Sequence, residues 1–272
     1  MGGFVKVIDG MRQVAEGLGV KVHTSEPVTK LITQNHNISR VLANGNSMDV
    51  DAVIGSADYH HIENSLLDIG LQSYSKDYWD SRSMSPSCLI FYLGVNKKLK
   101  NITHHNLFFH TDIEKHSCQI HTKPEWPTDP LFYVCCPSKT DETVAPVGSE
   151  NLFFLMPIAS GLEDSEATRA HYFDMIIEKF EDITDQSIKD NIIYSKSYCI
   201  NDFKNDYNAY KGNAYGLANT INQTANLKPK IKSKKVDNLF FSGQLTVPGP
   251  GVPPSIISGE ISANELLKQF KL

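Results

Sequence analysis

Three glycines near the end of the chain have the type and spacing of a ligand-binding loop. Residues 236–243 predict a buried strand that ends in Gly243, and Gly249 and Gly251 follow it before a helix that we expect to begin near Ser255. Glycine lets the backbone approach a ligand because no side chain intervenes. The N–H groups of a first helical turn can bind an anion or a polar ring. On these residues alone, the segment is either a ligand-binding loop or a structural strand-to-helix turn.

The segment 238–259 closely resembles the C-terminal flavin motif of bacterial-type phytoene desaturases. Over 238–255 the chain reads Asn-Leu-Phe-Phe-Ser-Gly-Gln-Leu-Thr-Val-Pro-Gly-Pro-Gly-Val-Pro-Pro-Ser. The upstream segment 208–217, the pair Lys228-Pro229, and an N-terminal Met-Gly-Gly-Phe followed by a helix and a β-meander also resemble this family. Pro254 departs from the pattern, because many members have a small residue there.

The resemblance implies FAD-dependent desaturation of an acyclic carotenoid such as phytoene, with hydride passing from a C–C bond of the long apolar polyene to the flavin. The protein would supply orientation and a dry site. Later carotenoid desaturases, polyene isomerases and saturases of the same superfamily remain open alternatives. The family's proton-handling residues match no part of this chain, so the catalytic residues stay unassigned.

The resemblance also assigns cofactor contacts by position. Gly243 matches a residue near the ribityl-phosphate chain, the loop that follows lies beside the flavin ring, and Val28 matches a residue whose backbone holds the adenine. The implied cofactor-binding residues are Val28, Ala57, Asp58, Gly243, Gln244, Thr246, Pro248, Gly249, Gly251, Val252, Pro253, Ser255 and Ile256. Separately, Tyr210 and Tyr215 are candidates to line a polyene tunnel, and sheet packing explains them equally well.

The elements that must position these residues follow from hydrophobic periodicity. Apolar residues at three- and four-residue steps predict helices over 4–18, 164–182 and 255–270, the second capped by Asp164. Asn44-Gly45 predicts a two-residue hairpin, and the small, apolar run 52–57 predicts a strand covered on both faces. The expected strands are residues 20–23, 28–32, 38–42, 48–50, 52–57, 88–95, 106–110, 131–136, 152–158, 192–195 and 236–243.

These elements predict a fold of the class α/β plus α+β. Residues 1–61 and 231–272 would form part of a Rossmann-like, amine-oxidase-type FAD-binding domain, and residues 62–230 an inserted substrate-binding domain built on an antiparallel sheet. A G-x-G-x-x-G turn after a strand, which opens such flavin domains, does not occur in the sequence. We therefore expect a C-terminal part of a longer enzyme whose partner is the N-terminal half, or else a non-catalytic apo fragment that binds apolar ligands.

Composition excludes some partners and leaves others open. The 272 residues carry a net charge of −5, which argues against general nucleic-acid binding. Neither a transmembrane run of about 20 apolar residues nor a signal peptide is present in the sequence. Because the substrate dissolves in membranes, we expect a cytoplasmic protein with peripheral contact at the inner face of the membrane.

Five cysteines without a C-x-x-C pair fit buried thiols in a reducing compartment. We expect no metal site, because neighbours in the pairs His60-His61 and His104-His105 would point to opposite faces of a strand.

Overall fold

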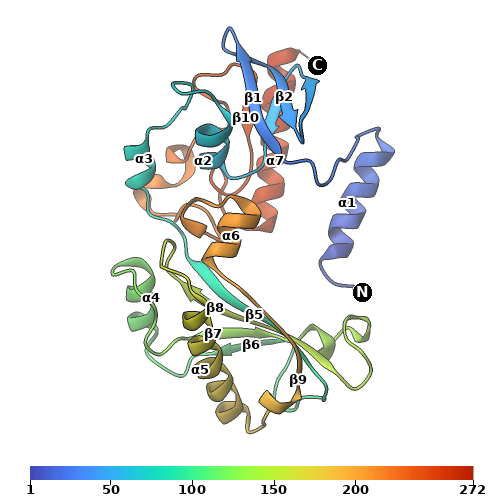
Figure 1. Cartoon of the computed structure of the whole chain (residues 1–272), viewed down its shortest axis with the longest axis vertical. Helices are drawn as coiled ribbons and strands as arrows, with labels where there is room; N and C mark the ends of the chain where they lie inside the picture. The colour runs from blue at the N-terminus through green and yellow to red at the C-terminus, as the bar shows by residue number, and fades with distance from the viewer. Residues whose placement is uncertain (272) are drawn as a thin grey trace. The chain divides into compact units, whose positions relative to one another are not determined.

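The computed structural model describes residues 1–271, and these residues form two compact units (Figure 1). Unit 1 comprises Met1–His23 and Ser87–Asn201, and unit 2 comprises Thr24–Pro86 and the segment from Asp202 onward. Each unit has a hydrophobic core of its own. Because each unit packs around its own core, each is described by itself.

The limits of these units differ from the sequence-based division at residues 62 and 230. Residues 1–23, which that division placed with the FAD-binding domain, belong to unit 1, and segments 62–86 and 202–230, which it placed with the substrate domain, belong to unit 2. Aromatic packing is the reason. Trp79 is fully buried with its ring 5.9 Å from that of Tyr59, and Tyr59 stacks on Phe241 of the C-terminal segment at 3.6 Å.

Unit 2 is organised around two short parallel strands that are far apart in sequence. β4 (Val53–Gly55) pairs with β10 (Leu239–Phe241), with Leu239 opposite Val53 and Phe241 opposite Gly55. β10 is fully buried, as predicted. The prediction that residues 52–57 are covered on both faces is wrong, because Ile54 remains 36% exposed.

One buried asparagine side chain joins this pair to the β-meander. Asn238 accepts a hydrogen bond from the Ile38 N–H at 2.7 Å and donates to the carbonyl oxygens of Ile38 and Asp51, each at 2.8 Å. The meander consists of β1 (Val28–Gln34), β2 (Asn37–Ala43) and β3 (Asn46–Asp49), all antiparallel.

The predicted hairpin is confirmed between β2 and β3. Asn44 and Gly45 both have positive φ, 47° and 78°, which is the backbone that a two-residue turn between twisted strands requires. The expected strand over residues 20–23 is wrong, because that segment has no strand partner and is exposed in the structure.

The helices of unit 2 include elements that the sequence did not reveal. α2 (Tyr59–His61) and the π-helical turn η1 (Ile62–Leu66) follow β4, and α3 (Lys76–Asp80) is also short, as is α6 (Ile200–Tyr207), which belongs to unit 2 from Asp202 onward. α7 (Val252–Phe270) lies along β10, where the Ser262 hydroxyl donates to the Phe241 carbonyl at 2.6 Å. Short 3₁₀ turns occur at Tyr210–Gly212, Ile221–Gln223 and Ala225–Leu227.

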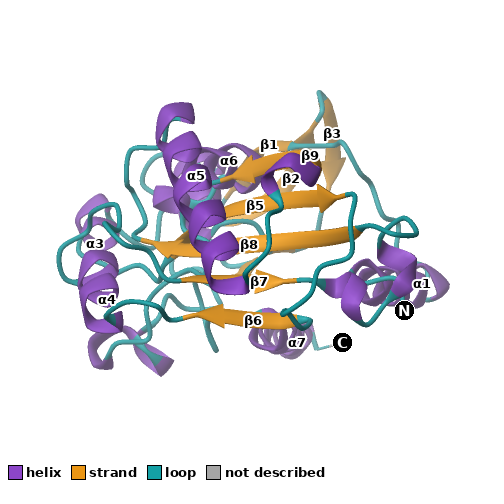
Figure 2. Ribbon diagram, turned by 90° about the horizontal axis from the view of Figure 1, so that it is seen from below, coloured by secondary structure: helices purple, strands orange, loops and turns teal. Residues whose placement is uncertain are grey.

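Unit 1 contains a five-stranded antiparallel sheet with the order β6-β7-β8-β5-β9. Figure 2 shows α5 (Glu166–Thr184) lying across one face of it. The sheet confirms the predicted strands in this region, and α4 (Ile113–His121) is an addition that was not predicted. The strand bounds are Ser87–Val95 for β5, His105–Phe108 for β6, Phe132–Cys135 for β7, Glu150–Ile158 for β8 and Ile192–Tyr198 for β9. Further 3₁₀ turns are Pro137–Lys139, Glu142–Val144 and Lys189–Asn191.

Two details of unit 1 correct the predictions. Ser165, and not Asp164, caps α5 by accepting a hydrogen bond from the Thr168 N–H. Asp164 instead pairs with Arg169 at 2.6 Å. His104 precedes β6 and only His105 belongs to it, so strand alternation does not separate their side chains. Their ring centroids lie 4.3 Å apart.

The face of the sheet opposite α5 is apolar and aromatic. Strand alternation sends Phe91, Phe154 and other core side chains toward α5 and the intervening ones to the other side. We call this second set the open face. It consists of Ile90 and Tyr92 on β5, Phe153 and Leu155 on β8, Tyr133 and Cys135 on β7, and His105 and Leu107 on β6.

α1 (Val5–Gly17) carries the predicted apolar stripe, yet none of its residues is buried. Phe4, Ile8, Met11 and Val14 are between 50% and 70% exposed. An amphipathic helix gains most of its stability from packing that face against a partner. The stripe is thus a surface without a partner among the described residues.

Replacing Asn238 with Ala tests the junction of the meander with the parallel pair. The change leaves a buried N–H and two buried carbonyl groups without their partner, so we expect a loss of about 3 kcal/mol in the free energy of unfolding. Urea unfolding measures it. Asn46→Ala, at an exposed position of β3, is the matched control and should cost little. Equal losses in both variants would contradict the assignment.

Candidate functional site

The glycines of the C-terminal loop adopt backbone conformations that other residues rarely reach. The φ angles of Gly243, Gly249 and Gly251 are 104°, 129° and 111°, in the region that favours glycine. A Cβ at Gly249 would lie 3.2 Å from the Lys228 Cε. The loop thus depends on glycine both for its backbone and for its close approach to a lysine side chain.

The helix after the loop starts earlier than predicted. α7 begins at Val252, with Gly251 as its N-cap and no side-chain cap, whereas the sequence suggested a start near Ser255. Pro253 and Pro254 occupy the second and third helical positions, where proline is tolerated. Since proline has no N–H, Val252 supplies the only amide donor of these three residues. This end of the helix suits one carbonyl of a flat ring better than a phosphate.

Hydrogen bonds tie the start of the loop to the end of β4. The Ser242 N–H donates to the Gly55 carbonyl at 3.0 Å, and the hydroxyls of Ser56 and Ser242 lie 2.8 Å apart. The Gly243 N–H donates to the Ser258 hydroxyl at 3.0 Å. Further along, the buried Thr246 hydroxyl donates to the Pro229 carbonyl at 2.6 Å.

A second loop, 208–217, is joined to the first through Asn213. The Asn213 side-chain oxygen accepts from the Gln244 side chain at 3.1 Å and from the Gly216 N–H at 2.7 Å. Gly216 has a φ of 74°, and a Cβ there would lie 2.6 Å from the Gln244 carbonyl oxygen. Asn213 was not among the predicted site residues, although it lies in the segment that carried the family resemblance.

Asp58 organises the same loop from the end of β4. Its carboxylate accepts hydrogen bonds from the His61 N–H at 3.0 Å and from the Tyr210 N–H at 2.9 Å. Burial raises the pKa of Asp58, while these backbone donors act in the opposite direction. The neighbouring Ala57 is exposed. The structure thus brings together Asp58 and Tyr210, which the sequence assigned to cofactor and substrate, respectively.

The two tyrosines proposed for substrate differ in their surroundings. The Tyr210 hydroxyl donates to Asp80 at 3.0 Å, and its ring lies 4.1 Å from that of His60. Burial lowers the pKa of His60. Tyr215 is 42% exposed. Tyr210 therefore has a packing role in unit 2, whereas the Tyr215 side chain is accessible.

The remaining predicted contacts fall into two groups. Val252, Pro253 and Ile256 are exposed on the first turns of α7, next to the half-buried Ser255, and Pro248 follows a cis peptide bond in the loop. Val28 begins β1 and is 38% exposed. Among the described residues, the hydrogen bonds of the C-terminal loop do not include Val28.

Lys228 lies next to the C-terminal loop, although the sequence did not predict it as a site residue. Its side chain is 2% exposed, and its ammonium donates to the Leu217 carbonyl at 3.3 Å. Burial lowers the pKa of Lys228. A lysine that gives up its proton more easily than a solvated one thus lies directly beneath Gly249. The sequence signal was present in Lys228-Pro229, but it was read as part of an exposed basic loop.

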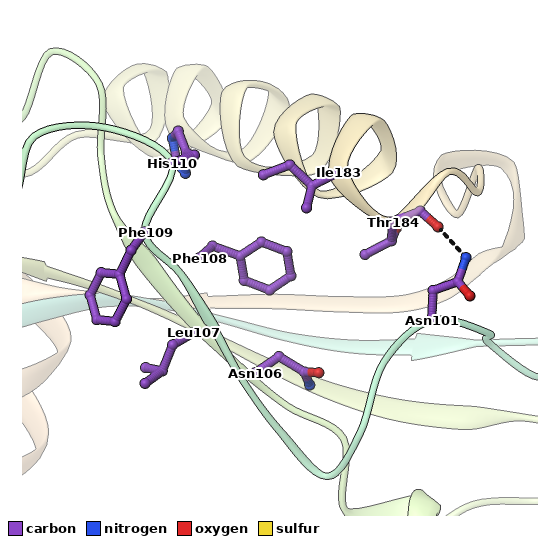
Figure 3. Close-up of a pocket in the computed structure, with 8 residues that line it drawn as sticks. All are labelled: Asn101, Asn106, Leu107, Phe108, Phe109, His110, Ile183 and Thr184. Carbon is purple, nitrogen blue, oxygen red and sulfur yellow. Dashed lines mark hydrogen bonds between the residues drawn. The ribbon is translucent and has the colours of Figure 1, made fainter.

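A shallow pocket of 510 Å³ occurs in unit 1 and includes none of the predicted site residues. Figure 3 shows Phe108 directed toward α5 and Leu107 and Phe109 directed away from it. Asn101 donates to the Thr184 carbonyl at 2.9 Å at one end. This pocket illustrates the alternation that creates the open face.

Among the described residues, no helix is long and apolar enough to cross a membrane.

Comparison with known proteins decides the family. Residues 1–267 match the family described as flavin containing amine oxidoreductase. The chain belongs to this family. The match confirms the predicted superfamily, the class of flavin-dependent oxidoreductases and FAD as its cofactor.

Two curated relatives of this flavin family are carotenoid desaturases. The chain is 40% identical over 269 residues to carotenoid 3,4-desaturase of Haloarcula japonica, covering 99% of this chain and 54% of that protein. It is 27% identical to the zeta-carotene-forming phytoene desaturase of Myxococcus xanthus, covering 98% of this chain and 52% of that protein. The chain thus spans about half the length of these relatives.

Solved structures of two oxidoreductases confirm the predicted fold class. An oxidoreductase from Methanosarcina mazei gives a TM-score of 0.65 at 16% identity over 95% of this chain and 53% of that one. A putrescine oxidase gives 0.58 at 13% identity over 95% and 53%. At these identities the likeness concerns the fold alone.

Replacing Lys228 with Met tests the buried amine. Because the pKa of Lys228 in the folded protein lies below its unfolded value, protonation opposes folding. Its contribution to stability is complete above the unfolded pKa and is lost as pH falls through the folded pKa. As pH rises toward the ordinary lysine pKa of about 10.4, the wild type should therefore gain stability relative to Lys228→Met, as measured by urea unfolding. Lys232→Met, at an exposed position, should follow the wild type. A constant difference between wild type and Lys228→Met would contradict the expectation.

Proposed function

We propose that this chain is part of an FAD-dependent desaturase that removes hydrogen from a C–C bond of a carotenoid. The observation that carries the proposal is the 40% identity to carotenoid 3,4-desaturase across 99% of the chain. The glycine geometry of the C-terminal loop and the exposed start of α7 are consistent with it.

The same comparison favours a later carotenoid over phytoene as the substrate. Identity to the relatives named phytoene desaturase is 28% or lower, against 40% for the relative named 3,4-desaturase. We therefore propose that the enzyme acts on a polyene that already carries conjugated double bonds. Phytoene, the substrate predicted from the sequence motif, is the competing candidate.

FAD fits the residues of the C-terminal loop. Gly249 and Gly251 hold the loop in a positive-φ backbone, the exposed Val252 offers one N–H at the positive end of α7, and Gly243, Gln244, Thr246 and Pro248 belong to the same loop. When bound, FAD supplies a two-electron acceptor for hydride. The chain's own residues would position the ring, keep water from it and, through Lys228, hold a proton beside it.

The open face in unit 1 is the proposed contact for the polyene. Tyr92 and Phe153 are cross-strand neighbours with ring centroids 5.4 Å apart, and Tyr133 lies 6.3 Å from Phe153. Strands are spaced about 4.8 Å apart, so these rings form a continuous apolar strip. A long hydrocarbon without hydrogen-bonding groups is bound by such a surface through buried area.

We propose that the exposed stripe of α1 contacts a polypeptide segment equivalent to the part of the Haloarcula japonica relative that this chain does not cover. The stripe is apolar, and the chain covers only 54% of its 40% identical relative. We also propose cytoplasmic, peripheral contact with the inner face of the membrane, because the substrate would be delivered from the lipid phase. A non-catalytic fragment that binds apolar ligands remains the alternative for the chain by itself.

Activity is tested with a chimera that joins this chain to the part of the Haloarcula japonica enzyme that it does not match. The chimera is assayed with phytoene and with a conjugated acyclic carotenoid, and products are separated by chromatography. Desaturation of the conjugated carotenoid supports the proposal, and desaturation of phytoene alone overturns the substrate choice. Absence of product from a flavin-loaded chimera contradicts the desaturase assignment.

Gly249→Val and Gly251→Val in the chimera test the flavin loop. Valine is strained at these φ values, so we expect at least tenfold less bound flavin, measured by visible absorbance after gel filtration. Gly259→Val is the matched control, since nothing lies within 4 Å of a Cβ at this position in α7. Unchanged flavin content in the two loop variants would remove the loop from the cofactor site.

Phe153→Ala in the chimera tests the open face. Loss of a half-buried aromatic ring from the apolar strip should raise KM for the carotenoid about tenfold, by lost contact area, with an unchanged flavin spectrum. Ile69→Ala, at a fully exposed position in unit 2, serves as the control. An unaltered KM in Phe153→Ala would place the substrate elsewhere.

A further inference from the structure

Three metal-ligating side chains converge at one end of the open face. His105 and Cys135 stand directly opposite each other on β6 and β7, and His104 precedes β6. One ring nitrogen of each histidine and the Cys135 sulfur all lie within 4.8 Å of one another. None of these residues belongs to the proposed flavin site, and His105 and Cys135 lie at the end of the open face beyond the Tyr92, Phe153 and Tyr133 rings proposed for the polyene.

Backbone pairing fixes the spacing of this cluster. The Cys136 N–H donates to the His104 carbonyl at 2.8 Å, which extends the β6–β7 ladder one step beyond His105 and Cys135. Because these positions belong to a paired sheet edge, the three side chains start from a fixed backbone frame. Only side-chain torsions need to change to bring them to one centre.

A hydroxyl group lies within hydrogen-bonding distance of the Nδ1 atom of each imidazole ring. The Nδ1 of His104 lies 2.6 Å from the Thr140 hydroxyl, and the Nδ1 of His105 lies 2.5 Å from the Tyr133 hydroxyl. Partners of this kind orient metal-bound histidines, because a hydrogen bond at one nitrogen leaves the other for the metal. The Tyr133 hydroxyl also interacts with the Cys135 thiol, and both lie on the open face.

We propose that His104, His105 and Cys135 form a zinc site, with solvent as the fourth ligand. One thiolate and two imidazoles are ligands that Zn²⁺ prefers, and in a tetrahedral site they lie about 3.5 Å apart. The ligand atoms lie within 4.8 Å of one another, so side-chain rotations that move them by about 1 Å bring them to that spacing. Deprotonation of the thiol balances one charge of the ion, and the released proton passes to solvent.

Such an ion, which we call the clip, would cross-link β6 to β7 at the edge of the sheet. β6 is an edge strand of four residues, and the ion would close the 30-residue loop from His105 to Cys135 across it. The clip stabilises the strand that carries Leu107 of the open face. This role needs no redox chemistry, which suits zinc.

Titration of the full, tag-free chain with Co²⁺ tests the site, because a Co²⁺–thiolate bond gives a near-ultraviolet charge-transfer band. We expect one equivalent to bind with that band, Zn²⁺ to displace it, and Cys135→Ser to abolish it. His105→Ala should weaken Co²⁺ binding at least 100-fold, and Tyr133→Phe about tenfold. Cys118→Ser removes the exposed cysteine of α4 and should change nothing.

The controls separate a built site from an adventitious one. Circular dichroism and thermal melting of each variant without metal show whether the fold is retained, and His105→Ala at an exposed position provides a second variant if Cys135→Ser is destabilised. A wild-type chain without the thiolate band, a band that survives in Cys135→Ser, or one lost in Cys118→Ser would overturn the proposal. These results are independent of flavin binding and desaturation.

Discussion

The parallel pairing of β4 with β10 is the contact on which unit 2 depends. It joins residues 53–55 to residues 239–241, and the Asn238 side chain extends it to the meander through three buried hydrogen bonds. Both strands end beside loops that carry predicted site residues, namely Asp58 after β4 and Gly243 after β10. Because ligands of open parallel sheets bind beyond the carboxyl ends of the strands, this pair determines where a cofactor would meet the chain.

Polar side chains carry that arrangement into the loops. Asp58 holds the backbone of Tyr210, and Asn213 links the Tyr210 loop to Gln244. Lys228 lies below Gly249 with its amine buried. The C-terminal loop is thus supported from three sides by groups whose hydrogen bonds are specific in direction. Such support holds the loop beside the carboxyl end of β4.

The sequence predicted local structure well where one residue type decides it. Asn44-Gly45 needs positive φ at both positions, and the apolar residues of segment 236–243 predict a buried strand, of which residues 239–241 form β10. It failed where distant segments decide the outcome. Trp79 joins unit 2 because it packs on Tyr59, and the rings of His104 and His105 lie on one side because β6 begins only at His105. The candidate loop was found from its glycines and its family resemblance, whereas Asn213 and Lys228 became visible only through contacts that no spacing encodes.

The central claim is that the loop held by the β4–β10 pair is the flavin contact of this chain. Hydrogen–deuterium exchange of the chimera with and without FAD tests it most directly. The account predicts slower exchange on FAD binding at residues 56–58 and 243–256, with little change at the open face in the absence of substrate. Protection confined to unit 1, or flavin binding that leaves residues 243–256 unprotected, would contradict it.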